Sequence, residues 1–132
     1  MAGFVIASPK SGSGKTMVVC GLLEAARRRG LSPWAFKCGP DYIDGLFHRQ
    51  VLGVDGGNLD SFFEGEEALR AKMQRVKQEH FVIAEGAMGY FDGLGGTTAR
   101  ASAWEIAHIL GMPAVLVVDA QGASLSLMAL IR

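Results

Sequence analysis

The feature that most constrains the fold is an apolar segment that leads straight into a glycine-rich loop and then into an amphipathic helix. Residues 3–8 (GFVIAS) are apolar and partly β-branched, which is typical of a buried parallel strand. Residues 9–14 (PKSGSG) consist largely of turn-forming residues. From Lys15 to Arg29 apolar residues recur at helical spacing, and Gly30 is placed to end the helix. The sequence therefore predicts a strand, a tight loop and a helix in direct succession.

A loop of this kind at the start of a helix is an anion-binding site. Gly12 and Gly14 allow successive backbone N–H groups to face an anion, and the helix dipole adds partial positive charge there. The segment 8–16 (SPKSGSGKT) fits a P-loop, although the strict pattern GxxxxGK[ST] fails at its first glycine, which here is Pro9. The residues expected to contact a nucleotide are Lys10, Ser11, Gly12, Ser13, Gly14, Lys15 and Thr16. Lys15 is expected to reach the β- and γ-phosphates of ATP, and the Thr16 hydroxyl to bind Mg²⁺.

Lys10 has two interpretations. In the deviant P-loops of partition-type ATPases, a second lysine at this offset reaches across a homodimer to the nucleotide of the partner. Lys10 is equally well explained as a solvated loop lysine. The sequence leaves both interpretations open, and a homodimer therefore stays a possible assembly of this chain.

The rest of the chain continues the alternation of strands and helices. Strands are expected at 31–37, 81–84 and 113–118, and helices at 64–79, 101–110 and 124–132. Gly, Pro, Asp and Asn recur through residues 38–63, so this segment is expected to be one long functional loop, and 85–98 a second, glycine-rich loop. The order predicts an α/β protein, a P-loop NTPase-like three-layer sandwich with a mainly parallel sheet of four strands. We expect this sheet to be incomplete in this chain.

Composition excludes several classes of protein. The 132 residues carry 13 Lys and Arg against 13 Asp and Glu, and this balance argues against a nucleic-acid-binding surface. No apolar stretch is long enough for a membrane span, and the N-terminus lacks a signal-peptide pattern. Cys20 and Cys38 lack CxxC spacing, which disfavours a disulfide framework or a zinc site and predicts a cytoplasmic location. The 18 glycines cluster between apolar runs, which favours nucleotide binding.

Two carboxylates follow predicted strands directly. Glu85 ends FVIAE and Asp119 ends PAVLVVD, and ligands of parallel α/β sheets bind at the carboxyl ends of strands. We favour a functional role for Glu85, because Gly86 and Gly89 leave the adjacent backbone uncluttered, and a turn or helix-cap role for Asp119.

Three further stretches combine with the glycine-rich loop to resemble one family. They are residues 36–44 (FKCGPDYID), 58–60 (NLD) and 85–93 (EGAMGYFDG). In this order and spacing they resemble the N-terminal part of the cobyrinic acid a,c-diamide synthase family, the glutamine-dependent ligases of corrin biosynthesis. The resemblance runs from Phe4 to the end of the chain and includes the stretch VLVVDAQG.

The resemblance implies a fold similar to that of dethiobiotin synthetase and a reaction that uses ATP and Mg²⁺ to phosphorylate a substrate carboxylate. Ammonia, released from glutamine by a separate C-terminal glutaminase domain, would then attack the acyl phosphate. Residues 1–132 would form the N-terminal part of the ATP-binding ligase domain, and the substrate would be a corrinoid or a related tetrapyrrole carboxylate. Neither cysteine has the context of a glutaminase nucleophile, so this chain is not expected to hydrolyse glutamine itself.

The resemblance also implies roles for individual residues. The residues implied in catalysis are Lys15, Lys37, Asp41, Tyr42, Glu85 and Asp92. The metal ligands would be Thr16, Asp41 and Glu85, while Lys37 would lie near the γ-phosphate, and Tyr42 and Asp92 would arrange the substrate or the intermediate.

Plain structural roles stay open for several of these residues. Asp41 follows Pro40 and suits a turn, Tyr42 suits packing, and Asp92 precedes a glycine in a common turn pair. His48 is either a ligand for a substrate carboxylate or a packed histidine, and Met88 is expected to fill core space.

One departure from the family pattern is Gly45, where members usually have proline. Two other functions stay open: a partition-type switch ATPase, suggested by Lys10, and a non-catalytic nucleotide-binding module that folds but is too short to close an active site.

Overall fold

The computed structural model describes residues 2–39 and 43–132 of the chain. A five-stranded sheet in the order β3-β2-β4-β1-β5 forms its centre, and all of its strand pairs are parallel. The strands are β1 (Ala2–Ala7), β2 (Ser32–Cys38), β3 (Gly56–Leu59), β4 (His80–Glu85) and β5 (Ala114–Leu116). The helices are α1 (Lys15–Arg28), α2 (Ile43–Gln50), α3 (Glu66–Arg75), α4 (Ala103–Leu110) and α5 (Leu127–Ile131), with one 3₁₀ turn at Leu94–Gly96.

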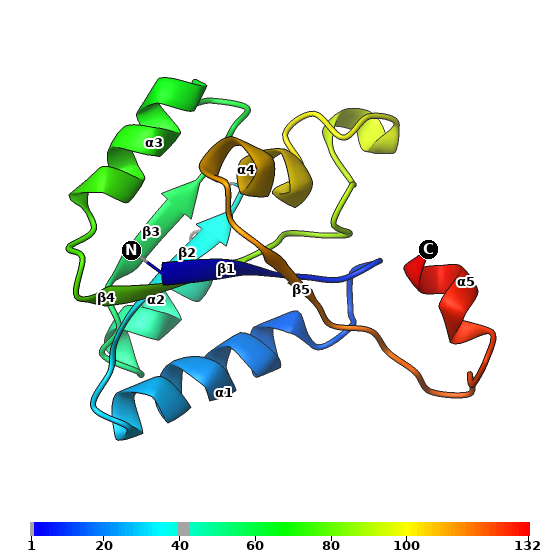
Figure 1. Ribbon diagram of the computed structural model, residues 1–132, viewed down its shortest axis with the longest axis horizontal. Helices are drawn as coiled ribbons and strands as arrows, with labels where there is room; N and C mark the ends of the chain where they lie inside the picture. Colours follow the sequence, from blue (N-terminus) through cyan, green and yellow to red (C-terminus); the bar gives the residue numbers. More distant parts are fainter. Residues whose placement is uncertain (1, 40–42) are drawn as a thin grey trace.

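Helices cover both faces of the sheet, which makes three layers. Helix α1 lies along one face, and α3 and α4 lie side by side over the other (Figure 1). The chain runs from β1 through β2 to β3 at one edge of the sheet and then back through β4 to β5 at the other edge. If the crossovers have the usual right hand, this reversal of direction puts the helices before β3 and those after it on opposite faces. The predicted fold class, an α/β three-layer sandwich of P-loop NTPase type, is confirmed.

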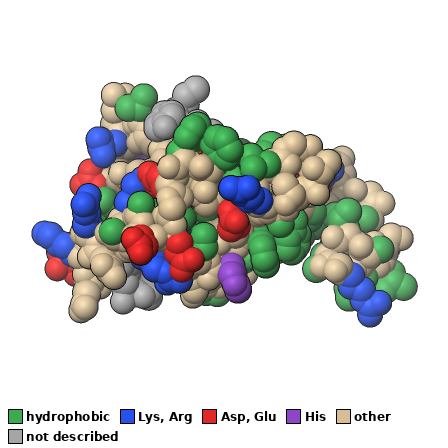
Figure 2. All heavy atoms as spheres, turned by 90° about the horizontal axis from the view of Figure 1, so that it is seen from above, with side chains coloured by type: hydrophobic (Ala, Val, Ile, Leu, Met, Phe, Trp, Pro, Cys, Tyr) green, Lys and Arg blue, Asp and Glu red, His purple; other side chains and the backbone are tan. Residues whose placement is uncertain are grey.

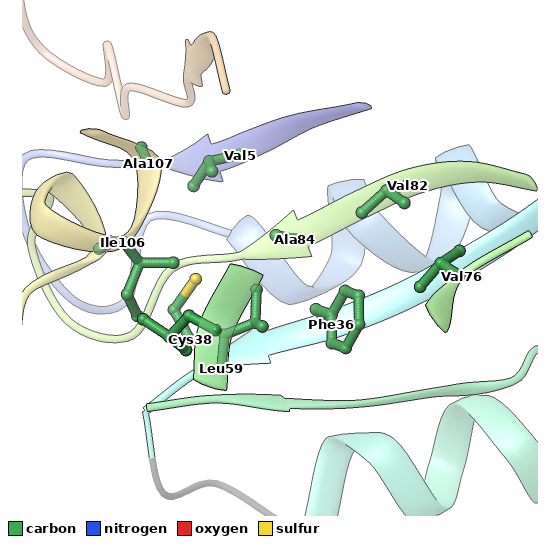
Figure 3. Close-up of a cluster of buried hydrophobic side chains, with 11 residues drawn as sticks. Val5, Phe36, Cys38, Leu59, Val76, Val82, Ala84, Ile106 and Ala107 are labelled. Atoms are coloured by element: carbon green, nitrogen blue, oxygen red, sulfur yellow. The ribbon is translucent and has the colours of Figure 1, made fainter. Parts of the chain in front are cut away.

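Alternate residues of the strands fill two separate cores. On the α1 face, Ile6 and Ile83 pack against Leu23, and on the other face Val5 and Val82 pack toward α4. Figure 3 shows the second core, where Ile106 of α4 lies beside Cys38 and Leu59 at the carboxyl ends of β2 and β3. Since both faces of the sheet are buried, the strands appear in the sequence as continuous apolar runs without alternation.

The sequence predicted one long loop at residues 38–63, and this prediction is wrong. The segment contains α2 and β3, so the sheet has five strands and not four. Strand β3 was missed because it reads GGNL, and glycine usually indicates a loop. Here Gly56 pairs with Ala35 so closely that a β-carbon on Gly56 would lie 1.8 Å from the Ala35 carbonyl oxygen. The glycine therefore marks a close backbone approach within the sheet.

The C-terminal elements are shorter than the sequence predicted. The predicted strand 113–118 is reduced to β5, an edge strand in which Val115 remains 48% exposed, and the predicted helix 124–132 to the five residues of α5. Helix α5 lies beyond β5, and in Figure 2 this end of the chain forms a separate lobe bearing apolar side chains. Among the residues described, no helix combines the length and the apolar character that crossing a membrane requires.

Candidate nucleotide-binding site

The loop between β1 and α1 forms an open cradle at the carboxyl edge of the sheet. Gly12 (φ +73°) and Gly14 (φ +86°) have left-handed backbone conformations, which glycine adopts without the strain that a β-carbon would add. The hydroxyl groups of Ser8 and Ser13 donate to the Lys10 carbonyl oxygen at 2.5 and 3.1 Å and hold the loop in its curve. A cavity of about 480 Å³ lies against residues 11–16 of this loop. The cradle predicted from the sequence is therefore open to a ligand.

Lys15 reaches across this cradle. Its side chain is buried, and its Nζ donates hydrogen bonds to Ser8 Oγ and to the Met88 carbonyl oxygen, both at 2.7 Å. Burial lowers the pKa of the Lys15 ammonium; the carboxylate of Glu85 opposes this shift, and the like charge of Lys37 adds to it. The ammonium is thus held at the cavity by two oxygen acceptors.

Glu85 lies at the end of β4 with its carboxylate inside the same cavity. Its Oε1 accepts a hydrogen bond from Thr16 Oγ1 at 2.6 Å and an ion pair from Lys37 Nζ at 2.9 Å. The parallel register explains the second contact, because Lys37 of β2 is the register partner of Glu85. The side chains of Glu85 and Lys37 are 1% and 8% exposed, so this edge of the sheet contains a buried ion pair.

The second carboxylate oxygen of Glu85 is buried and has no hydrogen-bond partner among the described residues. Burying a carboxylate oxygen without a partner costs free energy, unless a cation or a hydrogen-bond donor contacts that oxygen. Together with the Thr16 hydroxyl it forms a set of oxygen ligands, the donor type that Mg²⁺ prefers. The residues present therefore fit a magnesium ion, which Thr16 and Glu85 would hold.

The segment 85–93 packs directly against the cradle. The backbone N–H groups of Gly86 and Tyr90 donate to the carbonyl oxygens of Ile6 and Ser8 at 2.8 and 2.7 Å. Gly89 is required by this contact, because a β-carbon there would lie 2.7 Å from the Pro9 carbonyl oxygen. The glycine-rich loop that the sequence predicted after Glu85 is therefore a second wall of the site.

The structure also describes Asp92, Asp119 and Lys10, which the sequence analysis had singled out. Asp92 accepts a hydrogen bond from the Gly89 N–H at 2.9 Å, which is the turn role, and its charge slightly opposes the lowering of the Lys15 pKa that burial causes. Asp119 accepts from the Gln121 N–H at 2.9 Å, so the turn role favoured for it is confirmed. Lys10 is exposed, and this placement fits both of its interpretations.

Asp41 and Tyr42 lie outside the described residues, and their predicted roles stay predictions. His48 is packed: it is 2% exposed, and its Nε2 lies 3.8 Å from Cys20 Sγ. The prediction that Met88 fills core space is wrong, because its side chain is 53% exposed.

Sequence reasoning missed the two acceptors of Lys15. The Ser8 hydroxyl lies within the recognised segment 8–16, so its residue type offered a signal. The Met88 carbonyl offered none, because any residue supplies a carbonyl and only the path of the backbone brings this one to Lys15.

A parallel α/β sheet whose first strand leads through a glycine-rich cradle to a helix N-terminus, with an ammonium and a carboxylate in the cavity, defines a nucleotide-binding domain of P-loop type. The chain belongs to the CobQ/CobB/MinD/ParA nucleotide binding domain family, whose model matches residues 4–128.

Curated relatives narrow the comparison within that family. The chain is 44% identical, over 99% of its length, to a hydrogenobyrinate a,c-diamide synthase of Brucella anthropi and 45% identical, over 91%, to one of Mesorhizobium japonicum. It is 44% identical, over 98% of its length, to a cobyrinate a,c-diamide synthase of Clostridium acetobutylicum. The matches cover 30%, 28% and 29% of these relatives, so the chain spans less than a third of their length. The family resemblance predicted from the motifs is confirmed.

Proposed function

We propose that this chain is the N-terminal, ATP-binding part of a cytoplasmic ligase of cobalamin biosynthesis. The ligase amidates the a- and c-acetate carboxylates of cobyrinic acid, or of a closely related tetrapyrrole, with ammonia from glutamine. The observation that carries the proposal is the group formed by Lys15, Thr16, Lys37 and Glu85 in the P-loop cavity, of which all but Thr16 are buried. The names of the relatives support the substrate and the reaction.

The cradle suits the triphosphate of ATP. Residues 11–16 line the cavity at the N-terminus of α1, where the helix dipole favours negative charge. Lys15 is positioned to exchange its two oxygen acceptors for phosphate oxygens, and Lys37 lines the same cavity. Two ammonium groups can then neutralise charge on the transferred phosphoryl group.

Mg²⁺ would supply further charge neutralisation at the phosphates when bound. Thr16 and Glu85 are the described residues that would hold it, and we keep Asp41 as a third proposed ligand. The unpartnered Oε2 atom of Glu85 supports this assignment. None of these side chains has to act as a nucleophile, because positioning and charge neutralisation account for most of the catalysis of phosphoryl transfer.

The reaction needs ATP because a carboxylate is a poor electrophile. In the proposed sequence a substrate carboxylate oxygen attacks the γ-phosphorus, and the bond from that phosphorus to the bridging oxygen of ADP breaks. Ammonia then attacks the acyl carbon, loses a proton and expels inorganic phosphate, which leaves the amide. We propose that Tyr42 and Asp92 arrange the substrate for these steps and that a separate C-terminal glutaminase domain supplies the ammonia.

Isothermal titration of ATP with Mg²⁺ into the chain tests the nucleotide site. Lys15→Ala removes a charge-assisted contact, and we expect the binding free energy to weaken by about 1.5 to 3 kcal/mol. Lys77→Ala is the matched control, because Lys77 is exposed and lies in the connection between α3 and β4. Equal affinities of the two variants would contradict the role assigned to Lys15. Release of ADP stimulated by cobyrinic acid in the full-length ligase tests the reaction itself.

A partition-type switch is the second candidate, because the exposed Lys10 can reach a partner molecule. It predicts ATP-dependent dimerisation that light scattering detects and that Lys10→Ala abolishes. Dimerisation to the same extent with and without ATP would contradict the partition-type switch.

A further inference from the structure

A second hollow lies beside the nucleotide cavity. It has a volume of about 250 Å³, and its walls include Phe62, Phe63, Met88, Leu94 and Ala101, together with three glycines. It is bounded by the segments that follow β2, β3 and β4, so it opens at the same carboxyl edge of the sheet as the P-loop cavity. Ligands of parallel α/β sheets bind at this edge.

Met88 joins the two spaces, because it lines both of them. Its φ of +49° is a left-handed conformation that a residue with a side chain seldom adopts, and such strain concentrates at ligand sites. On the nucleotide side the Met88 carbonyl oxygen accepts the hydrogen bond from Lys15. A ligand in the hollow is thus one residue away from the group that would hold the phosphates.

The walls of the hollow are apolar and remain exposed. The side chains of Phe62 and Phe63 are 55% and 75% exposed, and their rings meet edge to face with centroids 4.7 Å apart. Adjacent exposed aromatic side chains of this size are characteristic of binding surfaces.

The polar lining does not offer a site for an anion. Asp60 is 8% exposed, and its Oδ1 accepts a hydrogen bond from the Phe62 N–H at 3.0 Å. No lysine or arginine occurs among the described residues that line the hollow. A carboxylate is therefore disfavoured inside the hollow, whereas Lys15 and Lys37 favour it in the adjoining cavity.

We propose that this hollow binds the apolar edge of the substrate macrocycle, so that an acetate arm extends past Met88 toward the γ-phosphate. This inference rests on the proposed function, which supplies a ligand that is apolar and flat at its centre and anionic at its periphery. Because the hollow has about half the volume of the nucleotide cavity, it accommodates one edge of the ring and leaves the other carboxylates in solvent. Phe62, Phe63 and Met88 are then contacts that position the substrate.

Equilibrium dialysis of cobyrinic acid against the chain, followed by corrin absorbance in the presence of ADP and Mg²⁺, tests the inference. The variant is Phe62→Ala/Phe63→Ala, which removes the two rings and leaves the P-loop unchanged. We expect its affinity for cobyrinic acid to fall about tenfold or more, because aromatic side chains dominate such contacts. Its affinity for ADP should stay within about twofold of the parent value. Phe91→Ala is the matched control, because Phe91 is 60% exposed but does not line the hollow.

Four outcomes would overturn the inference, and they are distinguishable. If the parent chain binds cobyrinic acid and the double variant binds it equally well, the hollow is not the site, and the proposed function stands. If the parent chain binds ADP but no cobyrinic acid, both the hollow and the proposed substrate are refuted. If the parent chain binds neither, the nucleotide site fails as well. Equal losses in the double variant and in Phe91→Ala would also exclude a specific role for the hollow.

Discussion

Lys37→Met probes the buried ion pair at the centre of the site. The substitution removes the ammonium and keeps a side chain of similar length, so packing changes little. The Glu85 carboxylate, 1% exposed, then loses its ion-pair contact and retains one hydrogen bond on Oε1, from Thr16. Breaking a buried ion pair by removing one partner destabilises a fold by about 3 to 5 kcal/mol.

The lower end of that range applies here, because the charge of Lys15 still acts on Glu85. We therefore expect Lys37→Met to lower the free energy of unfolding by about 3 kcal/mol. For a chain of this length that corresponds to a fall of roughly 12 °C in the melting temperature. Urea denaturation followed by circular dichroism measures the first quantity, and a thermal melt measures the second.

Three further variants make the test specific: the double variant Lys37→Met/Glu85→Gln, the single variant Glu85→Gln and Arg70→Met. Lys37→Met/Glu85→Gln also removes the negative charge of the unpaired Glu85 carboxylate. We expect this double variant to recover about half or more of the free energy of unfolding that Lys37→Met loses. Arg70→Met is the control for an exposed ion pair, since Arg70 and Glu66 are 51% and 57% exposed, and it should cost at most about 0.5 kcal/mol. If Lys37→Met costs no more than Arg70→Met, or if the effects of Lys37→Met and Glu85→Gln simply add, the reasoning is refuted.

Three more predictions concern other parts of the fold. Gly89→Ala should abolish ATP binding in titration calorimetry, because its β-carbon would lie 2.7 Å from the Pro9 carbonyl oxygen, whereas Gly21→Ala on open helix surface should retain binding. Burial raises the pKa of the Cys38 thiol to about 12, so between about pH 9 and 12 the unfolded chain loses a proton that the folded chain keeps. Stability should therefore fall as pH rises through this window, by about 1.4 kcal/mol per unit, and urea melts of Cys38→Ala should lack that slope. Val115→Lys, on the exposed edge strand β5, should reduce aggregation measured by light scattering, and unchanged aggregation would exclude β5 as its cause.

Local pattern was sufficient to predict the first β-α unit and its loop. Strand 3–8 and helix 15–29 were expected within one or two residues of β1 and α1, because burial on both faces, glycine at positive φ and helical spacing are all local signals. Strand β3 could not be predicted in this way. Its glycines adopt a strand conformation only because they pair with β2, which lies beside them in the sheet.

The candidate site divides in the same manner. The side-chain chemistry of Lys15, Thr16 and Glu85 was identified from the sequence, since a P-loop and a carboxylate at a strand end are local patterns. Neither the exposure of Met88 nor its carbonyl contact with Lys15 followed from any pattern. Both depend on the path of the backbone at Met88, which lies 73 residues from Lys15 in the chain.

By itself, then, the sequence determined the strands and helices other than α2 and β3, the phosphate cradle and the family, since each depends on residues that are neighbours in the chain. Only the tertiary structure decided that Lys37 pairs with Glu85, that one oxygen of Glu85 remains unpartnered, and that an apolar hollow adjoins the nucleotide cavity. The physical reason is that parallel strands bring together the ends of segments that lie far apart in the chain. The distances between those ends depend on sheet register and on the packing of loops, which no short stretch of sequence encodes.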